Sequence, residues 1–452
     1  MELEKGRMER FALVMEKYVP DAISSAVIMV LILTLFATSI GVPLFKTGEA
    51  YYKGFWILLA FTMQMTLIIT LSSVFGSSPL FRKIIMYLAR IPNSPHQVMV
   101  MATVLTGILA YFYWGMAITL GPVIAVYFCG EAQKKGIKVD FMVTLATVFA
   151  AHSIWQYGLS SSPALLVATP GHFLEKMTGQ MPMATTIWSP AAIINVIGFL
   201  IIILIVSRFL VPRTPKTIAE YPDAYKLVDD HQDEANAVED TEDLTFSQHV
   251  ERSYIMGYLL IFGIAVWLYF HFFVKHLSLD LNSLNAIILM LCFLLHRNVY
   301  RFTNALKEGI KSSWSVVVIY HLYALSAGIL MFTPAGEYIA KFLGGISTTL
   351  TFPLLMALSG TIIAIFVPSS GGQWAIQGFV TSKVAETIGV SFQRGLLSLG
   401  IGDQMGNLCS PFWYVIVAGI ARVDFRKFFG YGMIFAAIWF IWGVICFTLF
   451  PC

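Results

Sequence analysis

The sequence predicts an all-α integral membrane protein made of two inverted-topology repeats, each with a re-entrant helical hairpin and a broken helix. Three observations support this fold class. Of the 452 residues, 57% are hydrophobic and 12% are charged, and the mean hydropathy is +0.74, whereas soluble domains are roughly 25% charged. The apolar residues form runs long enough to cross a bilayer, and one pattern of polar and small residues occurs in both halves. This composition excludes a soluble enzyme.

Net charge and cysteine spacing exclude two further classes. A formal net charge of +3 is too small to indicate a nucleic-acid-binding protein. The five cysteines contain no C-x-x-C pair, so neither a disulfide framework nor a zinc site is indicated.

Seven uninterrupted apolar runs predict membrane-spanning helices. A helix rises about 1.5 Å per residue and the hydrocarbon core is about 30 Å thick, so a span needs roughly 20 residues. The runs are Ala22–Gly41, Phe55–Phe75, Thr185–Leu210, Tyr254–Val274, Leu284–Leu295, Ser313–Phe332 and Tyr431–Phe450. Residues 1–20 carry four basic side chains and are expected to form an amphipathic lead-in to an uncleaved first span.

Four further apolar runs are interrupted by Gly, Pro, Ser, Gln or Asp. We interpret Val98–Gly130 and Phe352–Thr387 as re-entrant hairpins, and Val139–Thr169 and Leu396–Gly419 as broken helices. With this arrangement, 22 of the 29 basic residues fall on one side of the membrane. The positive-inside rule then places the amino terminus in the cytoplasm, the carboxyl terminus outside, and the protein in the cytoplasmic membrane.

An acidic segment separates the two halves. Between Thr217 and Glu251 there are eleven acidic residues and a single basic one, Lys226, which is typical of a solvated cytoplasmic linker. The predicted organisation is therefore a first membrane repeat over residues 21–212, an acidic loop over 213–251, and an extra helix with the second, inverted repeat over 252–452.

The two halves resemble each other in sequence. An offset of 255 aligns Gly54 with Gly309 and Pro79 with Pro334. After the hairpins the offset becomes 248, and the pattern Q-x-G-x-x-x-S-P occurs at Gln156–Pro163 and again at Gln404–Pro411. Each repeat is predicted to cross the membrane four times, so without a further span both copies would start from the same side. The extra helix Tyr254–Val274 adds one crossing and therefore gives the second copy the opposite orientation in the membrane.

The interruptions predict a binding site. A helix broken inside the membrane frees N–H and C=O groups that lipid cannot satisfy, so such breaks occur where protein or a water-filled cavity satisfies them. Helix amino termini at Ala164 and Phe412 favour an anionic group, and a carboxylate is the natural ligand. The two hairpin tips are Trp114–Gly115 and Pro368–Gln373. We expect substrate contacts from these tips and from the first broken helix: Trp114, Gly115, Ser160, Ser161, Ser162, Ser369, Ser370, Gly371, Gly372, Gln373 and Trp374. For the three serines of the broken helix, the alternative is that they only satisfy the broken backbone.

Asp403 is the only acidic residue predicted deep inside a span. An uncompensated charge there costs at least about 2.5–3.5 kcal/mol on insertion scales. We expect it to bind sodium or carry a proton, and a structural role at a helix end is the alternative. Freed carbonyls and amide oxygens also hold sodium in inverted-repeat transporters. The candidate coupling-ion residues are Asp403, Gln404, Asn407, Ser410, Gln156 and His152; no other cofactor is expected. Gln64, by contrast, is expected to form a helix–helix hydrogen bond.

Three segments resemble the short-chain fatty acid transporter (AtoE-like) family: Lys53–Met65, Pro368–Gly378 and Gly402–Trp413. The resemblance spans nearly the whole chain, and the second tip is its most specific part. It implies a secondary transporter that moves monocarboxylates such as butyrate or acetoacetate with a cation, Na⁺ or H⁺. The hairpin and broken-helix pairs more distantly resemble the ion transporter superfamily, which implies an elevator mechanism and a homodimer.

Two other functions remain alternatives. A membrane-embedded hydrolase would be expected to contain G-x-S-x-G, whereas this chain has Gly158-Leu159-Ser160-Ser161. An anion channel would share the helix dipoles but would require neither a single deep acid nor four interrupted elements.

Overall fold

The protein is all-α in the computed structural model, which describes residues 20–228 and 245–452. These residues contain no β-strand, and eight of their helices are long and apolar enough to cross a membrane. The predicted amphipathic lead-in lies outside the described residues except for Pro20, as does the 229–244 part of the predicted acidic loop.

The first half of the chain contains the following main elements: α2 (Ala22–Ser39), α3 (Leu44–Gly54), α4 (Leu59–Gly76), α5 (Pro79–Ala89), α6 (Pro95–Phe112), α7 (Trp114–Lys134), α8 (Phe141–His152), the 3-10 helix η1 (Ser153–Tyr157), α9 (Ser162–Ala168) and α11 (Pro190–Leu210).

The second half contains these main elements: α13 (Phe246–Arg252), α14 (Tyr254–Tyr269), α15 (Leu281–His296), α16 (Val299–Gly309), α17 (Trp314–Phe332), α18 (Ala335–Ile346), α19 (Phe352–Ala364), α20 (Ser370–Ile388), α21 (Phe392–Cys409), α22 (Pro411–Ala421) and α23 (Arg426–Leu449).

Polar residues cap many of the helices. The Asp140 carboxylate accepts from the Val143 amide at the start of α8 (3.0 Å), and the Ser94 hydroxyl accepts from Gln97 at the start of α6 (3.2 Å). Such caps satisfy amide groups that have no partner within the helix. Proline occupies the first turn of α6, α9, α11 and α22, where its missing N–H removes no helical bond.

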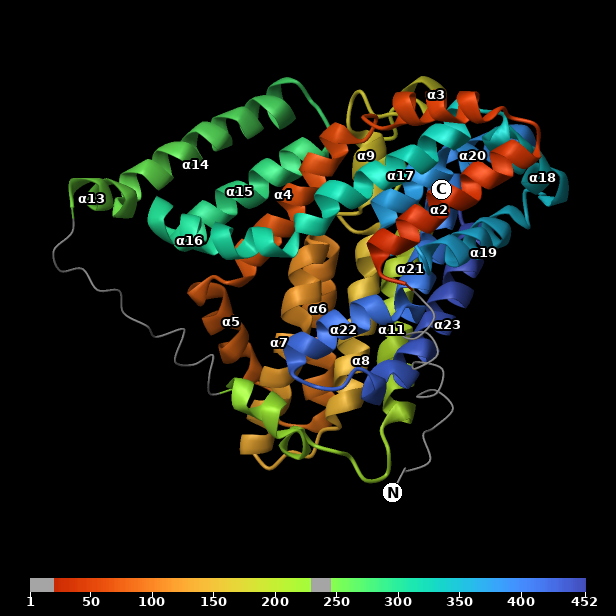
Figure 1. The fold of residues 1–452 in the computed structure, drawn as a ribbon. Helices are drawn as coiled ribbons and strands as arrows, with labels where there is room; N and C mark the ends of the chain where they lie inside the picture. Colours follow the sequence, from red (N-terminus) through yellow and green to blue (C-terminus); the bar gives the residue numbers. More distant parts are fainter. Residues whose placement is uncertain (1–19, 229–244) are drawn as a thin grey trace.

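The helices form two groups that meet along α4 and α17 (Figure 1). In one group, α4 packs against α15, α16 and α17, and α17 packs against α2 and α3. In the other, α6, α7 and α8 pack together, α21 packs against α19, α20 and α23, and α23 contacts α8 and α11. Gln64 joins α4 to α15, donating to Asn282 (2.8 Å) and accepting from Asn285 through its carbonyl (3.1 Å). This confirms the helix–helix role expected for Gln64.

Helix boundaries repeat between the halves. Adding 255 to the bounds of α3 gives those of α16, and the same offset takes the first residue of α4 to that of α17. The aligned glycines also pack alike. A Cβ at Gly54 would lie 2.8 Å from the Ala324 carbonyl oxygen of α17, and a Cβ at Gly309 would lie 2.9 Å from the Thr70 carbonyl oxygen of α4. In each half, a glycine therefore permits close contact with the long helix of the other half.

All four predicted interruptions are present. The α6–α7 break falls at Tyr113, and the α19–α20 break spans residues 365–369. The α8 helix passes through η1 and an irregular turn into α9, and Ser410 separates α21, which ends at Cys409, from α22.

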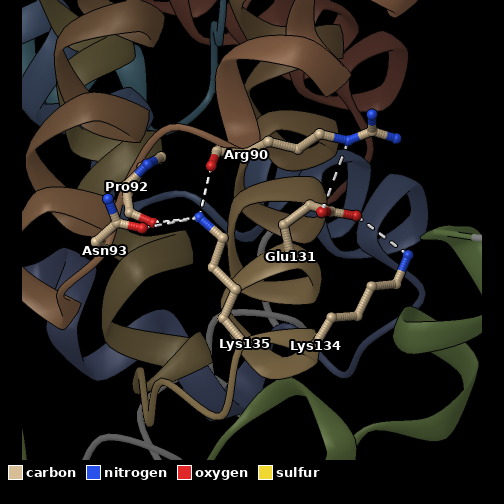
Figure 2. A network of polar contacts seen from close by, with 6 residues as sticks. All are labelled: Arg90, Pro92, Asn93, Glu131, Lys134 and Lys135. Carbon is tan, nitrogen blue, oxygen red and sulfur yellow. Dashed lines mark hydrogen bonds and ion pairs between the residues drawn. The ribbon is translucent and has the colours of Figure 1, made fainter.

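The ends of α6 and α7 opposite the first tip are fixed by a polar network. Figure 2 shows the six residues that form it: Arg90, Pro92, Asn93, Glu131, Lys134 and Lys135. The Lys135 ammonium donates to the carbonyls of Arg90 (2.5 Å) and Pro92 (2.8 Å) and to the Asn93 side chain (3.1 Å). Glu131 pairs with Lys134 (3.1 Å) and Arg90 (3.8 Å). This network holds the α5–α6 loop against the end of α7.

The described beginning of the acidic segment is packed rather than fully solvated. Ile218, Leu227 and Val228 are buried, and residues 222–228 are helical. The Lys216 amide donates to the Asp140 carboxylate (3.0 Å), and Val228 lies against Gly130 of α7. The predicted linker is therefore anchored to α7 and α8 before the chain reaches residue 229.

The close contact at Gly54 yields a stability prediction. We expect Gly54→Ala to lower the free energy of unfolding by about 1–3 kcal/mol, because the new methyl group would meet backbone atoms of α17. Gly48 lies in the same helix, and a Cβ there would have no other atom within 4 Å, so Gly48→Ala should raise stability or leave it within about 1 kcal/mol. Thermal unfolding followed with a thiol-reactive dye measures both, because four cysteines are buried. If Gly54→Ala and Gly48→Ala changed the free energy of unfolding equally, the role of close packing at Gly54 would be contradicted.

Candidate functional site

A cavity of about 480 Å³ brings the four interrupted elements together. Both hairpin tips, the α8–η1–α9 segment and the α21–α22 segment contribute to its wall. Eight of the predicted site residues line it: Trp114, Gly115, His152, Ser162, Ser369, Ser370, Gln404 and Asn407.

Helices of the other group complete the wall. From α4 come residues such as Met65 and Ile69, and from α17 come Ile319, Tyr320 and Tyr323. Among the described residues that line the cavity there is no lysine or arginine, and Asp21, at the start of α2, is the one acidic residue. An anion in this cavity would therefore be held by hydrogen bonds and helix dipoles rather than by an ion pair.

The first tip is positioned by its own half and by α4. The Trp114 amide donates to the Ser160 hydroxyl (2.8 Å), and the Tyr113 hydroxyl donates to the Ile68 carbonyl of α4 (2.7 Å). The His152 Nε2 lies 3.2 Å from the Trp114 carbonyl. Because a carbonyl only accepts, Nε2 carries the proton in this contact. The expected anion ligand Ser160 thus satisfies the broken backbone.

The second tip is positioned by α17 and by the first half. The Ser369 hydroxyl caps α20 by accepting from the Gly372 amide (3.3 Å), and it lies 2.7 Å from the Tyr320 hydroxyl. The Ser370 hydroxyl lies 2.8 Å from Nε2 of Gln156. Gly371 and Gly372 allow close approach, but to aromatic rings, because a Cβ at these positions would overlap the rings of Phe61 and Tyr323 respectively. These two glycines, predicted to contact the substrate, therefore pack against aromatic side chains.

The two glutamines of the repeated motif each reach into the opposite half. Gln156 contacts Ser370 of the second tip. Gln404 accepts from Trp155 Nε1 (3.0 Å) and donates to the Ser153 hydroxyl (3.0 Å), both in η1. Both glutamines are predicted ion ligands. In the structure, the Gln404 side chain joins the two broken helices, and the Gln156 side chain joins the first broken helix to the second tip.

The motif glycines have matching surroundings. A Cβ at Gly158 would lie 2.5 Å from the Tyr111 carbonyl at the end of α6, and a Cβ at Gly406 would overlap Ala364 at the end of α19. In each half, the glycine lets the broken element pack directly against the first helix of the hairpin.

Asp403 lies on α21 just behind the cavity wall and is 1% exposed. Its Oδ2 accepts from Asn407 in a long hydrogen bond (3.4 Å). The Ser370 hydroxyl of the second tip also lies close enough to stabilise the carboxylate charge, but Oδ1 makes no hydrogen bond of normal geometry within the described residues. Asn407 itself accepts from Trp413 Nε1 (3.1 Å). No salt bridge within residues 20–228 and 245–452 involves this carboxylate. A buried, incompletely bonded carboxylate is costly unless a cation or proton neutralises it.

Several predicted site residues lie outside the cavity wall: Ser160, Ser161, Gly371, Gly372, Gln373, Trp374, Gln156, Asp403 and Ser410. Gln373 donates to the Gly360 carbonyl (2.8 Å) and to Gln377 (2.7 Å), so it fastens α20 to α19. Ser410 caps α22 by accepting from the Phe412 amide (3.4 Å). The Trp374 indole packs beside Gly378 and is 1% exposed.

Two tyrosines of α17 were missed by the sequence reasoning. Tyr320 and Tyr323 both line the cavity and both contact the second tip. The available signal was a pair of tyrosine hydroxyl groups, three residues apart, inside a predominantly apolar span. Such hydroxyls need partners, and a spacing of three residues places them on one helix face.

Comparisons with known proteins agree with this architecture. Residues 5–449 match the family model described as short chain fatty acid transporter. A Haemophilus influenzae protein provisionally named a short-chain fatty acid transporter is 27% identical, over 97% of this chain and 99% of its own. An Escherichia coli protein with the same provisional name is 25% identical, over 98% and 100%.

Two solved structures share the fold. The YdaH transporter of Alcanivorax borkumensis superposes with a TM-score of 0.57 at 15% identity, covering 95% of this chain and 97% of its own. MtrF of Neisseria gonorrhoeae, whose structure was described with a class of antimetabolite efflux pumps, gives a TM-score of 0.50 at 12% identity, covering 98% and 97%.

The isolation of Asp403 gives a second stability prediction. In sodium-free buffer at alkaline pH, we expect Asp403→Asn to raise the free energy of unfolding by about 1–3 kcal/mol, because it removes a buried charge with an unpaired oxygen. Asp140→Asn is the matched control. Both Asp140 oxygens accept amide hydrogen bonds, so losing one acceptor should cost about 1 kcal/mol. A destabilised Asp403→Asn protein would instead support the structural role.

Proposed function

The chain belongs to the short-chain fatty acid transporter family, and from this premise we propose that it is a secondary transporter that moves short-chain monocarboxylates, such as butyrate or acetoacetate, across the cytoplasmic membrane together with a cation. The observation that carries this proposal is the cavity at which the interrupted helices converge. It combines features suited to a carboxylate with features suited to an alkyl chain.

Helix amino termini supply the anion-binding features. The α7 helix begins at Trp114, α20 at Ser370 and α22 at Pro411, and Trp114, Ser370 and Phe412 all line the cavity. Each terminus carries the positive end of a helix dipole and free amide groups. Three such termini favour a negative group in a cavity whose described lining has no lysine or arginine.

The apolar part of the wall suits the rest of the substrate. Ile69, Ile118, Ile319 and Phe412 line the same cavity as the helix termini. A short alkyl chain buried against these side chains gains about 0.8 kcal/mol per CH₂ group. A second carboxylate would find no counter-charge among them, which favours monocarboxylates.

Asp403 is the proposed site of cation coupling. A sodium ion would use its free Oδ1 together with nearby carbonyl and amide oxygens, whereas a proton would bind the carboxylate directly. Either ion removes the charge that the protein leaves unpaired. The sequence and geometry are compatible with both ions, so the proposal is coupling to Na⁺ or H⁺.

We further propose an elevator mechanism for two inverted repeats. The helices that contain both tips would move together as a rigid body relative to α2–α4 and α14–α17. A second copy of the chain would bind through α2–α4 and α14–α17. Matching glycine contacts in the two halves support the repeat. The distribution of basic residues supports a cytoplasmic amino terminus.

The function is tested by uptake into proteoliposomes. Labelled butyrate should accumulate above its outside concentration when an inward sodium or proton gradient is imposed, and uptake should saturate. Imposing each gradient separately identifies the coupling ion. Downhill flux without accumulation would indicate a channel, and a chemically altered product would indicate an enzyme.

Coupling is tested by Asp403→Asn. We expect gradient-driven accumulation to fall at least tenfold, because the neutral amide neither takes up a proton nor adds charge to a sodium site. Asp424→Asn is a control in the loop before α23, where Asp424 pairs with Arg426 (2.6 Å); it should retain accumulation. Unchanged accumulation by Asp403→Asn would refute the coupling role.

A further inference from the structure

Two buried hydrogen-bond donors in the cavity wall have no acceptor. They are the indole N–H of Trp114 and the hydroxyl of Tyr323, on side chains that are 8% and 1% exposed. Neither finds a partner anywhere in residues 20–228 and 245–452. Buried polar groups are nearly always hydrogen-bonded in folded proteins, so exceptions call for an explanation.

Other donors of the same wall are paired. The Tyr320 hydroxyl contacts Ser369, and the Trp155 and Trp413 indoles donate to Gln404 and Asn407. The two unpaired donors are therefore not a general feature of the aromatic residues around this cavity. Among these aromatic residues, the lack of an acceptor is specific to the Trp114 indole and the Tyr323 hydroxyl.

The two donors come from opposite parts of the site. Trp114 is the first residue of α7 in the first tip, and its carbonyl is held by His152 (3.2 Å). The Trp114 ring packs near those of Trp155 and Trp413, with centroids 5.7 and 6.3 Å away. Tyr323 projects from α17 against Gly372 of the second tip. Both side chains are thus fixed by contacts that do not involve their donor groups.

We propose that the Trp114 indole N–H and the Tyr323 hydroxyl bind the substrate carboxylate, one donor from each side of the cavity. This inference rests on the proposed function and identifies the groups that recognise its substrate. An ionised carboxylate only accepts hydrogen bonds, and the indole N–H only donates. The pair therefore suits an anion in a wall without lysine or arginine, and it binds the charged carboxylate more strongly than the neutral amide, because hydrogen bonds to an ionised acceptor are stronger than those to a neutral one.

Two conservative variants test the assignment. Trp114→Phe and Tyr323→Phe each remove one donor and keep an aromatic ring. Each should raise the KM for butyrate about tenfold, since a hydrogen bond to a charged group is lost. Inhibition by butyramide should change less than twofold, so discrimination between anion and amide falls. Because the Tyr323 hydroxyl has no partner within the described residues, ligand-free Tyr323→Phe should melt no earlier than the unmodified protein, whereas Trp114→Phe also loses ring packing against Trp155 and Trp413 and should melt somewhat earlier.

Matched controls are available outside the cavity. Tyr414 is fully buried and its hydroxyl also lacks a partner among the described residues, but it does not line the cavity. Tyr414→Phe should therefore leave the KM unchanged. Trp442→Phe, which removes an indole bond to the Asn195 carbonyl (3.1 Å), should do the same.

The outcomes separate the two proposals. If the unmodified protein neither accumulates butyrate nor is stabilised by it, the proposed function fails. If it does both, while Trp114→Phe and Tyr323→Phe keep the original KM and the original preference over butyramide, the carboxylate assignment is overturned. Should one variant fold poorly, the other gives the same test, because each donor is predicted to act on its own.

Discussion

Backbone groups that are freed where a helix stops inside an apolar environment must be satisfied within the protein, and this constraint organises the structure. The Trp114 amide finds the Ser160 hydroxyl, the Gly372 amide finds Ser369, and the Phe412 amide finds Ser410. Lipid offers no alternative partners. Each interruption is therefore accompanied by a nearby serine, and the remaining free groups converge on one cavity.

The same constraint ties the two halves together. Gln156 and Gln404 occupy equivalent positions in the repeated motif, and each bonds to residues of the other half. Breaking one of these contacts leaves a buried amide unpaired, which costs more than the bond itself contributes. The interrupted elements of both halves are thus expected to behave as a unit around the cavity. The contacts of the two tips with α4 and α17 include aromatic packing and single hydroxyl bonds.

The sequence predicted the interruptions, the repeat and most of the spans because these depend on local composition. It also predicted the role of Gln64, since an amide in an apolar helix needs a partner. It did not reveal Tyr320 and Tyr323, or that Gly371 and Gly372 face aromatic rings. Those features depend on how each helix is rotated against its neighbours, and rotation is set by tertiary packing that a single sequence does not encode locally.

The absence of lysine and arginine from the described cavity lining has a consequence for the proposed coupling. A bound carboxylate and an ionised Asp403 carry the same sign and lie in a low-dielectric region where repulsion is weakly screened. In the proposed mechanism, a cation that neutralised Asp403 would remove that repulsion, so the cation and the carboxylate would each strengthen the binding of the other. Such coupling is reciprocal by thermodynamic necessity. An arginine in the wall would instead hold the carboxylate regardless of the cation, and the linkage on which symport depends would be lost.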